Sequence, residues 1–319
     1  MVTPPGSPLP PLPILQRDWY WRGWQIRYRY GRPHPAPANP NPPLVCLHGF
    51  GASSGHWRHN LGVWGQRGPV YALDLLGFGA SAKPATGYSP LFWATLVRDF
   101  CREVVGEPGV WVGNSLGSVV AMTGAIAHGD WVRGLVWVNL PDNSVLWPKG
   151  WPPGNAAPKP RNPRRFSPFA AFAQGVQALV TGPWVITPIL YAARSPRILY
   201  PALASAYGDT TAVDDTLRQM VRDPAHDRHA AQALRFITRG MGQIPRPYQA
   251  RIALPQLQIP MLLLWGSGDR LVPPQLAPRC VALNPQIQLE MFPGGGHCLQ
   301  DECPDRVNAL VLDWLAQHF

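Results

Sequence analysis

A serine lies between two glycines in the segment GNSLG, residues 113–117. The apolar residues before this segment predict a strand, and residues 115–127 predict a helix. A serine at such a strand-to-helix turn has strained backbone, and glycines two positions before and after it relieve the crowding there. Its hydroxyl also lies at a helix N-terminus, where free N–H groups favour negative charge. A tetrahedral oxyanion would form at this position, so we predict that Ser115 is a nucleophile.

A serine hydroxyl is a poor nucleophile unless a base takes its proton. Of the nine histidines, only His297 lies in a flexible loop at the end of a predicted strand, in FPGGGHCLQDE. Asp269 follows another predicted strand in LLLWGSGDRLVP and is the predicted orienting acid, with Asp142 as the alternative. An isolated histidine is more often structural, and a loop aspartate is more often solvated. The order Ser, Asp, His is that of the α/β-hydrolases, however, and it predicts the triad Ser115, Asp269 and His297.

An oxyanion hole needs two N–H donors. The amide of Leu116 follows the nucleophile, and the amide of Phe50 lies in LHGFG after the first predicted parallel strand. We predict these two donors, and we expect His48 to be a structural hydrogen-bonding residue rather than a base. Dehalogenases and soluble epoxide hydrolases of this fold have aspartate where Ser115 stands, so the serine favours acyl transfer to water. No metal or organic cofactor is implied by this chemistry.

Short apolar strands alternate with helical patterns over most of the chain, which predicts parallel βαβ units. An opening hairpin at residues 18–30 turns near Gly23. Between residues 141 and 250 the alternation stops, and helical patterns occur without a convincing strand. The predicted strands cover 44–47, 70–74, 109–114, 133–139, 261–265 and 287–292, and the predicted helices cover 89–105, 115–127, 274–283 and 304–318.

The predicted fold class is therefore α/β. It is an α/β-hydrolase fold with a mostly parallel sheet, flanking helices and a helical lid insertion. The predicted regions are a Pro-rich N-terminal tail (1–17), the first part of the core (18–140), the lid (141–250) and the second part of the core (251–319).

The composition is that of a globular protein, since the 319 residues are 46% hydrophobic and 14% charged. The five cysteines show no metal-binding spacing, and the sequence has no secretory signal and no run of 18 apolar residues. We therefore expect a cytoplasmic protein without a structural disulfide.

Residues 141–250 carry much of the net charge of +10, with thirteen Lys and Arg against six Asp. A basic surface facing an anionic membrane, a polyanion partner and Arg-rich codon usage are alternative explanations; a nucleic-acid partner is not expected.

Several segments together resemble the pheophytinase and chlorophyll dephytylase family, from about Trp19 to the C-terminus. They are LHGFGASSGHWRHN, YALDLLGFGASAKP, YSPLFWATLVRDF, GNSLGS, VDDTLRQMVRDPAHDRHAAQALRFI and GGGHCLQDECPDRVN. The resemblance implies the same triad and oxyanion donors, and hydrolysis of the phytyl ester of chlorophyll or pheophytin. The chain departs from the family at Ser118, where glycine is usual, and at HCLQDE, where the family has HCPQDE. The lack of a transit peptide favours a bacterial, and specifically a cyanobacterial, member.

Two features of the predicted lid bear on such a substrate. An apolar helical face would line a groove for a C20 tail, or would simply pack the lid onto the core. Its residues are Phe166, Phe169, Phe172, Val176, Leu179 and Val180. A basic stretch with interleaved tryptophans indicates peripheral contact with an anionic membrane, such as the thylakoid, or else a solvated loop. Its residues are Trp147, Lys149, Trp151, Lys159, Arg161, Arg164 and Arg165.

Two other functions fit the same residues. The first is a carboxylesterase or lipase-like enzyme, or a C–C bond hydrolase of the same fold, acting on another hydrophobic substrate. The second is a non-catalytic receptor that retains the triad and binds a hormone-like ligand. Labelling of the serine by a fluorophosphonate would separate the receptor from the enzymes, because only an activated serine reacts.

Overall fold

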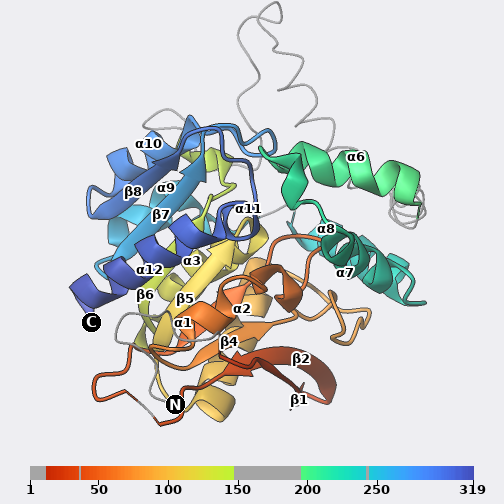
Figure 1. Cartoon of the computed structure of the whole chain (residues 1–319), viewed down its shortest axis with the longest axis horizontal. Coiled ribbons are helices and arrows are strands. Elements are labelled where there is room, and N and C mark those ends of the chain that lie inside the picture. The colour runs from red at the N-terminus through yellow and green to blue at the C-terminus, as the bar shows by residue number, and fades with distance from the viewer. Residues whose placement is uncertain (1–11, 36, 147–194, 242–243) are drawn as a thin grey trace, which may run out of the picture.

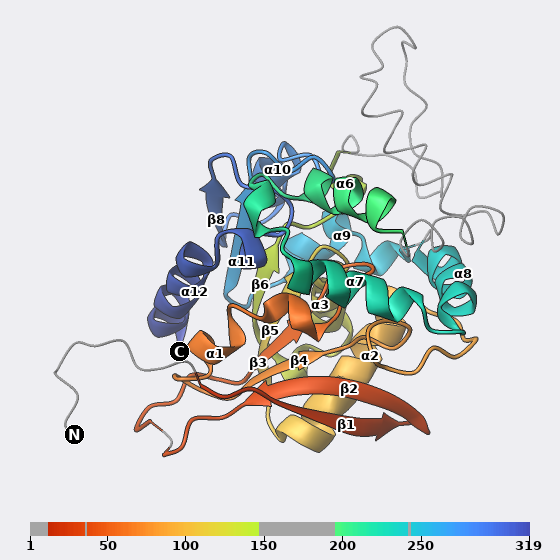
Figure 2. The ribbon, with the colours of Figure 1, turned by 45° about the vertical axis from the view of Figure 1, so that its right-hand side comes forward.

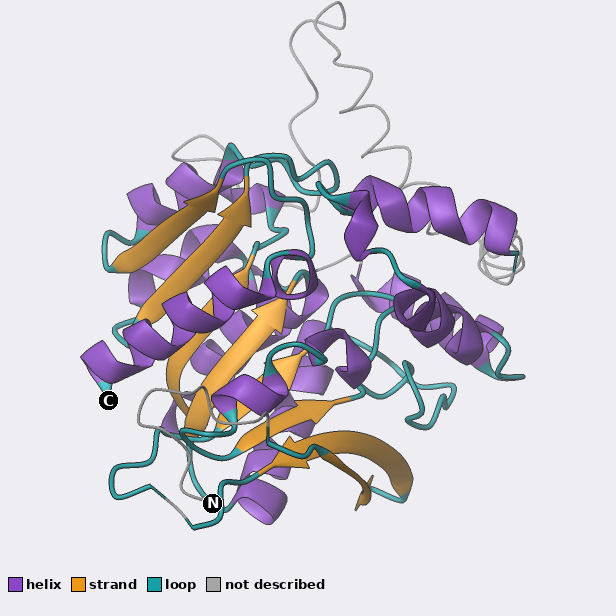
Figure 3. Cartoon of the chain, viewed as in Figure 1, coloured by secondary structure: helices purple, strands orange, loops and turns teal. Residues whose placement is uncertain are grey.

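An eight-stranded sheet with helices on both faces forms the core of the computed structural model (Figures 1 and 3). The structure describes residues 12–35, 37–146, 195–241 and 244–319. The strand order is β1-β2-β4-β3-β5-β6-β7-β8. The strand bounds are β1 (Leu15–Trp21), β2 (Trp24–Gly31), β3 (Leu44–Leu47), β4 (Val70–Leu73), β5 (Gly109–Asn114), β6 (Val132–Val138), β7 (Met261–Gly266) and β8 (Ile287–Phe292).

The predicted hairpin and parallel sheet are both confirmed. Strands β1 and β2 pair antiparallel and turn at Arg22 and Gly23, both of which have positive φ. Strand β2 also pairs antiparallel with β4, and all pairs from β4 to β8 are parallel. The central strands are buried along their whole length, which explains their uninterrupted apolar sequences, because a parallel sheet is covered on both faces.

Two hydrophobic clusters lie on opposite faces of this sheet. One face packs against α2, α3, α9 and α10, with Trp93, Trp111 and Trp137 among its buried side chains. The other packs against α1 and α12, with Trp64 and Trp314 among its buried side chains. The helices on the two faces are α1 (Leu61–Trp64), α2 (Pro90–Phe100, continued by a π-turn at Cys101–Val105), α3 (Leu116–Ala127), α9 (Ala250–Ala253), α10 (Leu276–Leu283) and α12 (Pro304–His318).

Three helices lie beside the carboxyl ends of the central strands, as Figures 1 and 2 show. They are α6 (Pro196–Ala206), α7 (Asp215–Ala225) and α8 (Ala230–Met241), and we call residues 195–241 the cap. No strand occurs in the cap, in line with the predicted helical lid. The boundaries of the lid stay a prediction, because residues 147–194, with the apolar helical face and the basic stretch predicted there, lie outside the described residues.

Candidate active site

Ser115 occupies a strained turn between β5 and α3. Its φ is 54° and its ψ is −112°, a conformation that a side-chain-bearing residue rarely adopts. A Cβ at Gly113 would overlap the backbone of Gly117 and Ser118, and a Cβ at Gly117 would overlap the carbonyl oxygen of Leu47. The turn therefore requires the glycines on both sides of the serine, as the sequence predicted.

Ser118 also belongs to this turn. Its buried hydroxyl donates a hydrogen bond to the Gly113 carbonyl at 2.9 Å. The side chain thus satisfies its own polar atom locally, and α3 still approaches β5 closely. The departure from glycine at this position leaves the geometry of the turn intact.

The two predicted oxyanion donors are the backbone N–H groups of Phe50 and Leu116. Within the described residues, neither the N–H of Phe50 nor that of Leu116 donates to a protein acceptor. Leu116 is the first residue of α3, so its N–H belongs to the unpaired first turn of a helix. Both groups follow the carboxyl ends of neighbouring strands, β3 and β5, which pair directly.

His48 fixes the peptide that carries one of these donors. Its Nε2 accepts from Leu75 N at 3.1 Å, so the ring proton is on Nδ1, which donates to the Gly49 carbonyl at 2.7 Å. The same peptide unit carries the N–H of Phe50 on its opposite edge. Burial lowers the pKa of His48, which keeps the ring neutral. The expectation that His48 is a structural hydrogen-bonding residue is confirmed.

His297 and Asp269 form a buried pair. The Nδ1 of His297 lies 2.8 Å from Oδ2 of Asp269, and the carboxylate is fully buried. The other oxygen, Oδ1, accepts from the N–H groups of Leu271 and Val272, each at 2.8 Å. These three donors hold the carboxylate and place the imidazole proton on Nδ1, so Nε2 is left as an acceptor.

The alternative acid, Asp142, lies elsewhere. Its carboxylate accepts from Ser144 N at 2.8 Å and from Ala250 N at 2.6 Å, at the start of α9. Burial raises its pKa, and these backbone bonds oppose that shift. Asp142 therefore holds the chain entering α9, and the structure pairs His297 with Asp269 instead.

Two asparagines that were not among the predicted site residues hold the His297 backbone. Asn114 Nδ2 and Asn139 Nδ2 donate to the His297 carbonyl at 3.1 Å and 2.8 Å. Both residues are almost completely buried, and Asn139 has a positive φ of 54°. Asn114 is the last residue of β5 and Asn139 directly follows β6, so an asparagine at the end of each of two predicted neighbouring strands could have indicated this role.

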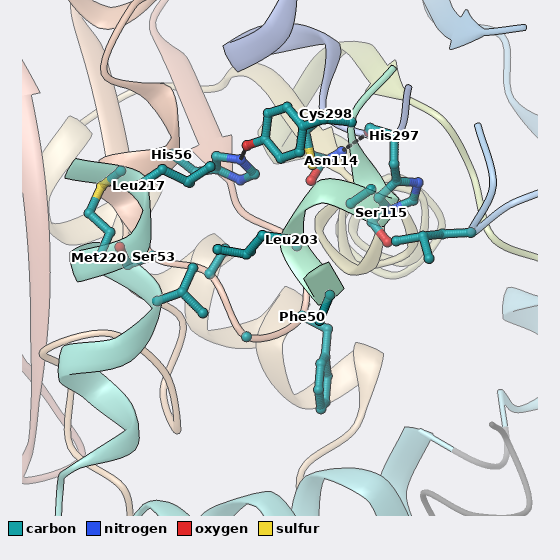
Figure 4. A pocket seen from close by; sticks show the side chains of 18 residues that line it. Phe50, Ser53, His56, Asn114, Ser115, Leu203, Leu217, Met220, His297 and Cys298 are labelled. Atoms are coloured by element: carbon teal, nitrogen blue, oxygen red, sulfur yellow. Dashed lines mark hydrogen bonds between the residues drawn. The ribbon is translucent and has the colours of Figure 1, made fainter. Parts of the chain in front are cut away.

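Ser115 and His297 line one cavity of about 310 Å³ between the core and the cap. In Figure 4 both side chains lie at one side of this cavity, with Leu217 and Met220 at the other. Most of the wall is apolar. The cap contributes Ala202, Leu203, Ala206, Tyr207, Leu217, Met220 and Val221, and the core contributes Gly49, Phe50, Gly51, Ala52, Ser53, His56, Asn114, Ser115, Leu271, His297 and Cys298.

A buried polar network adjoins this cavity. His56 Nε2 lies 3.0 Å from the Tyr207 hydroxyl, which donates to Asp301 Oδ2 at 2.9 Å. Gln300 Nε2 lies 3.3 Å from His56 Nδ1, and Arg58 donates to Asp301 Oδ1 at 2.7 Å. Burial lowers the pKa of His56 to about 4, an effect that Asp301 partly offsets. The ring is therefore neutral at pH 7 and acts as a hydrogen-bonding group.

Within the described residues, no group of three or more His, Cys, Asp or Glu is arranged to hold a metal ion. All five cysteines have free thiols. None of the described helices combines the length and the apolar character that crossing a bilayer would require.

Residues 44–310 match the model of the alpha/beta hydrolase family. The chain belongs to this family. The match includes the turn at Ser115, the Asp269–His297 pair and both predicted oxyanion donors. In this alpha/beta hydrolase the matched range begins after the β1–β2 hairpin and contains the cap and every candidate site residue.

Curated relatives of this hydrolase carry different activities in their names. Epoxide hydrolase 3 of Xenopus tropicalis is 23% identical over 286 residues, covering 88% of this chain and 72% of the relative. Haloalkane dehalogenase 2 of Mycobacterium tuberculosis is 28% identical over 295 residues, covering 89% and 91%. The human (lyso)-N-acylphosphatidylethanolamine lipase is 26% identical over 249 residues, covering 72% and 66%.

A solved structure shows the same fold. The epoxide hydrolase CorEH superposes with a TM-score of 0.76 at 20% identity, covering 96% of this chain and 99% of the other. At this identity the likeness concerns the fold alone. None of the relatives named here is a pheophytinase, so the resemblance to that family stays a prediction.

Proposed function

We propose that this alpha/beta hydrolase is a serine esterase that uses Ser115, His297 and Asp269. The observation that carries the proposal is the strained serine that shares a cavity with a histidine whose Nδ1 is held by a buried carboxylate. An aspartate at this turn would attack directly through its own oxygen, whereas a serine needs the base that His297 supplies. The presence of Ser115, rather than an aspartate, in the same cavity as His297 therefore favours acyl transfer over epoxide or carbon–halogen cleavage.

In the first half of the reaction, Ser115 Oγ attacks the ester carbonyl while His297 Nε2 takes the hydroxyl proton. The N–H groups of Phe50 and Leu116 stabilise the oxyanion. The carbon–oxygen bond to the alcohol then breaks, and His297 returns the proton to the leaving alcohol. Asp269 stabilises the imidazolium that forms in between.

In the second half, water attacks the acyl-enzyme as His297 takes a proton from it. The bond to Ser115 Oγ breaks, the carboxylic acid leaves and the serine recovers its proton. Over the two halves, one ester and one water give one alcohol and one carboxylic acid, and Ser115 and His297 return to their starting states.

The apolar wall indicates the substrate class. Leu203, Leu217, Met220 and Val221 face the cavity from the cap, so the bound part of the ester is hydrocarbon. Each buried CH2 group contributes about 0.8 kcal/mol to its binding. The volume of about 310 Å³ lies near the lower end of ligand sites, which fits one chain rather than a large ring system. The finer prediction, the phytyl ester of chlorophyll or pheophytin, rests on the sequence resemblance.

The test combines fluorophosphonate labelling with hydrolysis of p-nitrophenyl esters of increasing acyl length. Wild type should label at Ser115 and hydrolyse the esters, and a folded Ser115→Ala variant should do neither. A wild type that stays unlabelled would favour the receptor. Release of halide or diol from a haloalkane or epoxide, without ester turnover, would refute the esterase. Incubation with chlorophyll and with pheophytin, followed by chromatography for the dephytylated acid, tests the phytyl substrate separately.

A further inference from the structure

The carboxylate of Glu302 joins two segments that lie far apart in the sequence. It accepts from the backbone N–H groups of Gly208 and Asp209, each at 3.0 Å, in the segment that follows α6 in the cap. It also accepts from the N–H of Gly296, at 3.0 Å and 3.2 Å to its two oxygens. Gly296 directly precedes His297, so one carboxylate connects the cap to the loop of the proposed base.

Other contacts make the same connection. The N–H of His297 itself donates to the carbonyl of Ala206 at 2.7 Å. The Tyr207 hydroxyl donates to Asp301, the neighbour of Glu302 in α11 (Leu299–Glu302). A Cβ at Gly208 would overlap the Gly294 carbonyl, and one at Gly296 would overlap the Gly208 N–H. The two segments therefore touch backbone to backbone.

These contacts tie the position of His297 to that of the cap. Its carbonyl is fixed to the core by Asn114 and Asn139, while its N–H is bonded to the cap. Ala206 and Tyr207 also line the cavity. Residues 206–209 thus serve both as cavity wall and as one support of the base. A shift of this segment has to break its bonds to His297 and Glu302 or displace the imidazole.

We propose that Glu302 is a positioning residue that aligns His297 with Ser115 when the cap is seated on the core. This inference rests on the proposed function, since it assigns Glu302 a role through the base. A carboxylate suits the task, because its two oxygens provide enough acceptor sites for three converging N–H groups. A glutamine would turn an NH2 group toward at least one of these donors.

The first test is Glu302→Gln, assayed with p-nitrophenyl acetate, whose short acyl group contacts little of the cap. We expect kcat to fall about 10- to 100-fold, because displacement of a catalytic group by about 1 Å costs that much. KM should change little. The rate of fluorophosphonate labelling should fall by the same factor, since it reports the activation of Ser115 without ester binding. Loss of stability alone would lower neither rate in the folded protein.

A matched control loosens the cap at another contact. Asp227 of the cap accepts from Lys83 of the core at 3.2 Å, and neither residue lines the cavity. Asp227→Asn removes the charge of this pair and keeps the oxygen that accepts from His229 N. We expect kcat and labelling at the wild-type rate in this variant. An equal loss in Asp227→Asn would mean that any cap perturbation slows the enzyme, and it would overturn the specific role of Glu302.

A second variant covers the case in which Glu302→Gln does not fold. Tyr207→Phe removes the hydroxyl that joins the cap to Asp301 and to His56, and it should slow labelling several-fold. Wild-type labelling in a folded Glu302→Gln, or in Tyr207→Phe if only that variant folds, overturns the inference. If the wild type itself does not label, the proposed function has failed instead.

Discussion

Replacement of Asp269 by asparagine should leave the fold intact and trap His297 in the wrong tautomer. Oδ1 of Asp269 accepts from two backbone N–H groups, those of Leu271 and Val272. The asparagine must therefore keep its oxygen at this position, and its NH2 group then faces His297 Nδ1. Nδ1 has to become an acceptor, which moves the ring proton to Nε2. His297 can then no longer take the proton of Ser115.

The size of the effect follows from the same contacts. The productive tautomer requires the amide to turn over, which places its NH2 group against both backbone donors. Two hydrogen bonds are lost at about 1–3 kcal/mol each, or about 2–6 kcal/mol together. At about 1.36 kcal/mol per factor of ten, this is roughly a 30-fold to 3 × 10⁴-fold loss of activity. The lost stabilisation of the imidazolium adds to it, so we expect kcat/KM to fall about 10³- to 10⁴-fold.

The assay is kcat/KM for a p-nitrophenyl ester, with Asp142→Asn as the matched control. Asp142 is also a buried aspartate after a strand, but its carboxylate bonds Ser144 N and Ala250 N. We expect its replacement to cost about 1–3 kcal/mol of folding free energy and to leave kcat/KM within a few-fold of wild type. The reasoning is refuted if Asp269→Asn keeps more than a tenth of the activity, or if Asp142→Asn is the more damaging change.

Two further predictions concern the far side of the cavity. Met220 lines the cavity, and its sulfur fills the space that a side chain at Gly55 would take. Met220→Ala should therefore enlarge the cavity and shift the preferred p-nitrophenyl ester toward longer acyl chains; an unchanged optimum over a chain-length series would contradict this. His56 has a pKa of about 4 in the folded protein and 6.5 when unperturbed, so the unfolded chain binds the extra proton between these values. Folding stability should rise by about 3 kcal/mol from pH 4 to pH 6.5, and fall again as the pH drops through this window. His56→Gln should flatten the dependence in urea unfolding, and an equal slope in both proteins would show that other groups cause it.

The sequence by itself determined the sheet and the chemistry of the turn. Strand β3 coincides with its predicted residues, because a strand buried on both faces must be apolar throughout and is bounded by polar or glycine-rich segments. The role of the glycines around Ser115 could also be predicted from the sequence, since close approach of α3 to β5 leaves no space for a Cβ. Signals of this kind are local: they depend on a few neighbouring residues and on general geometry.

Only the tertiary structure decided which polar groups meet. Asp142 and Asp269 both follow a strand, and the sequence ranked Asp269 first without excluding Asp142. Only the folded contacts show that one carboxylate holds α9 and the other holds His297. The contact of Glu302 with Gly208 joins residues 94 positions apart. Hydrogen bonds of this kind form because the fold brings two backbones together. The sequence of either segment alone does not predict which other segment it will contact. The cavity has the same origin, since its wall combines cap residues such as Leu203 with core residues such as Ser115 that meet only after folding.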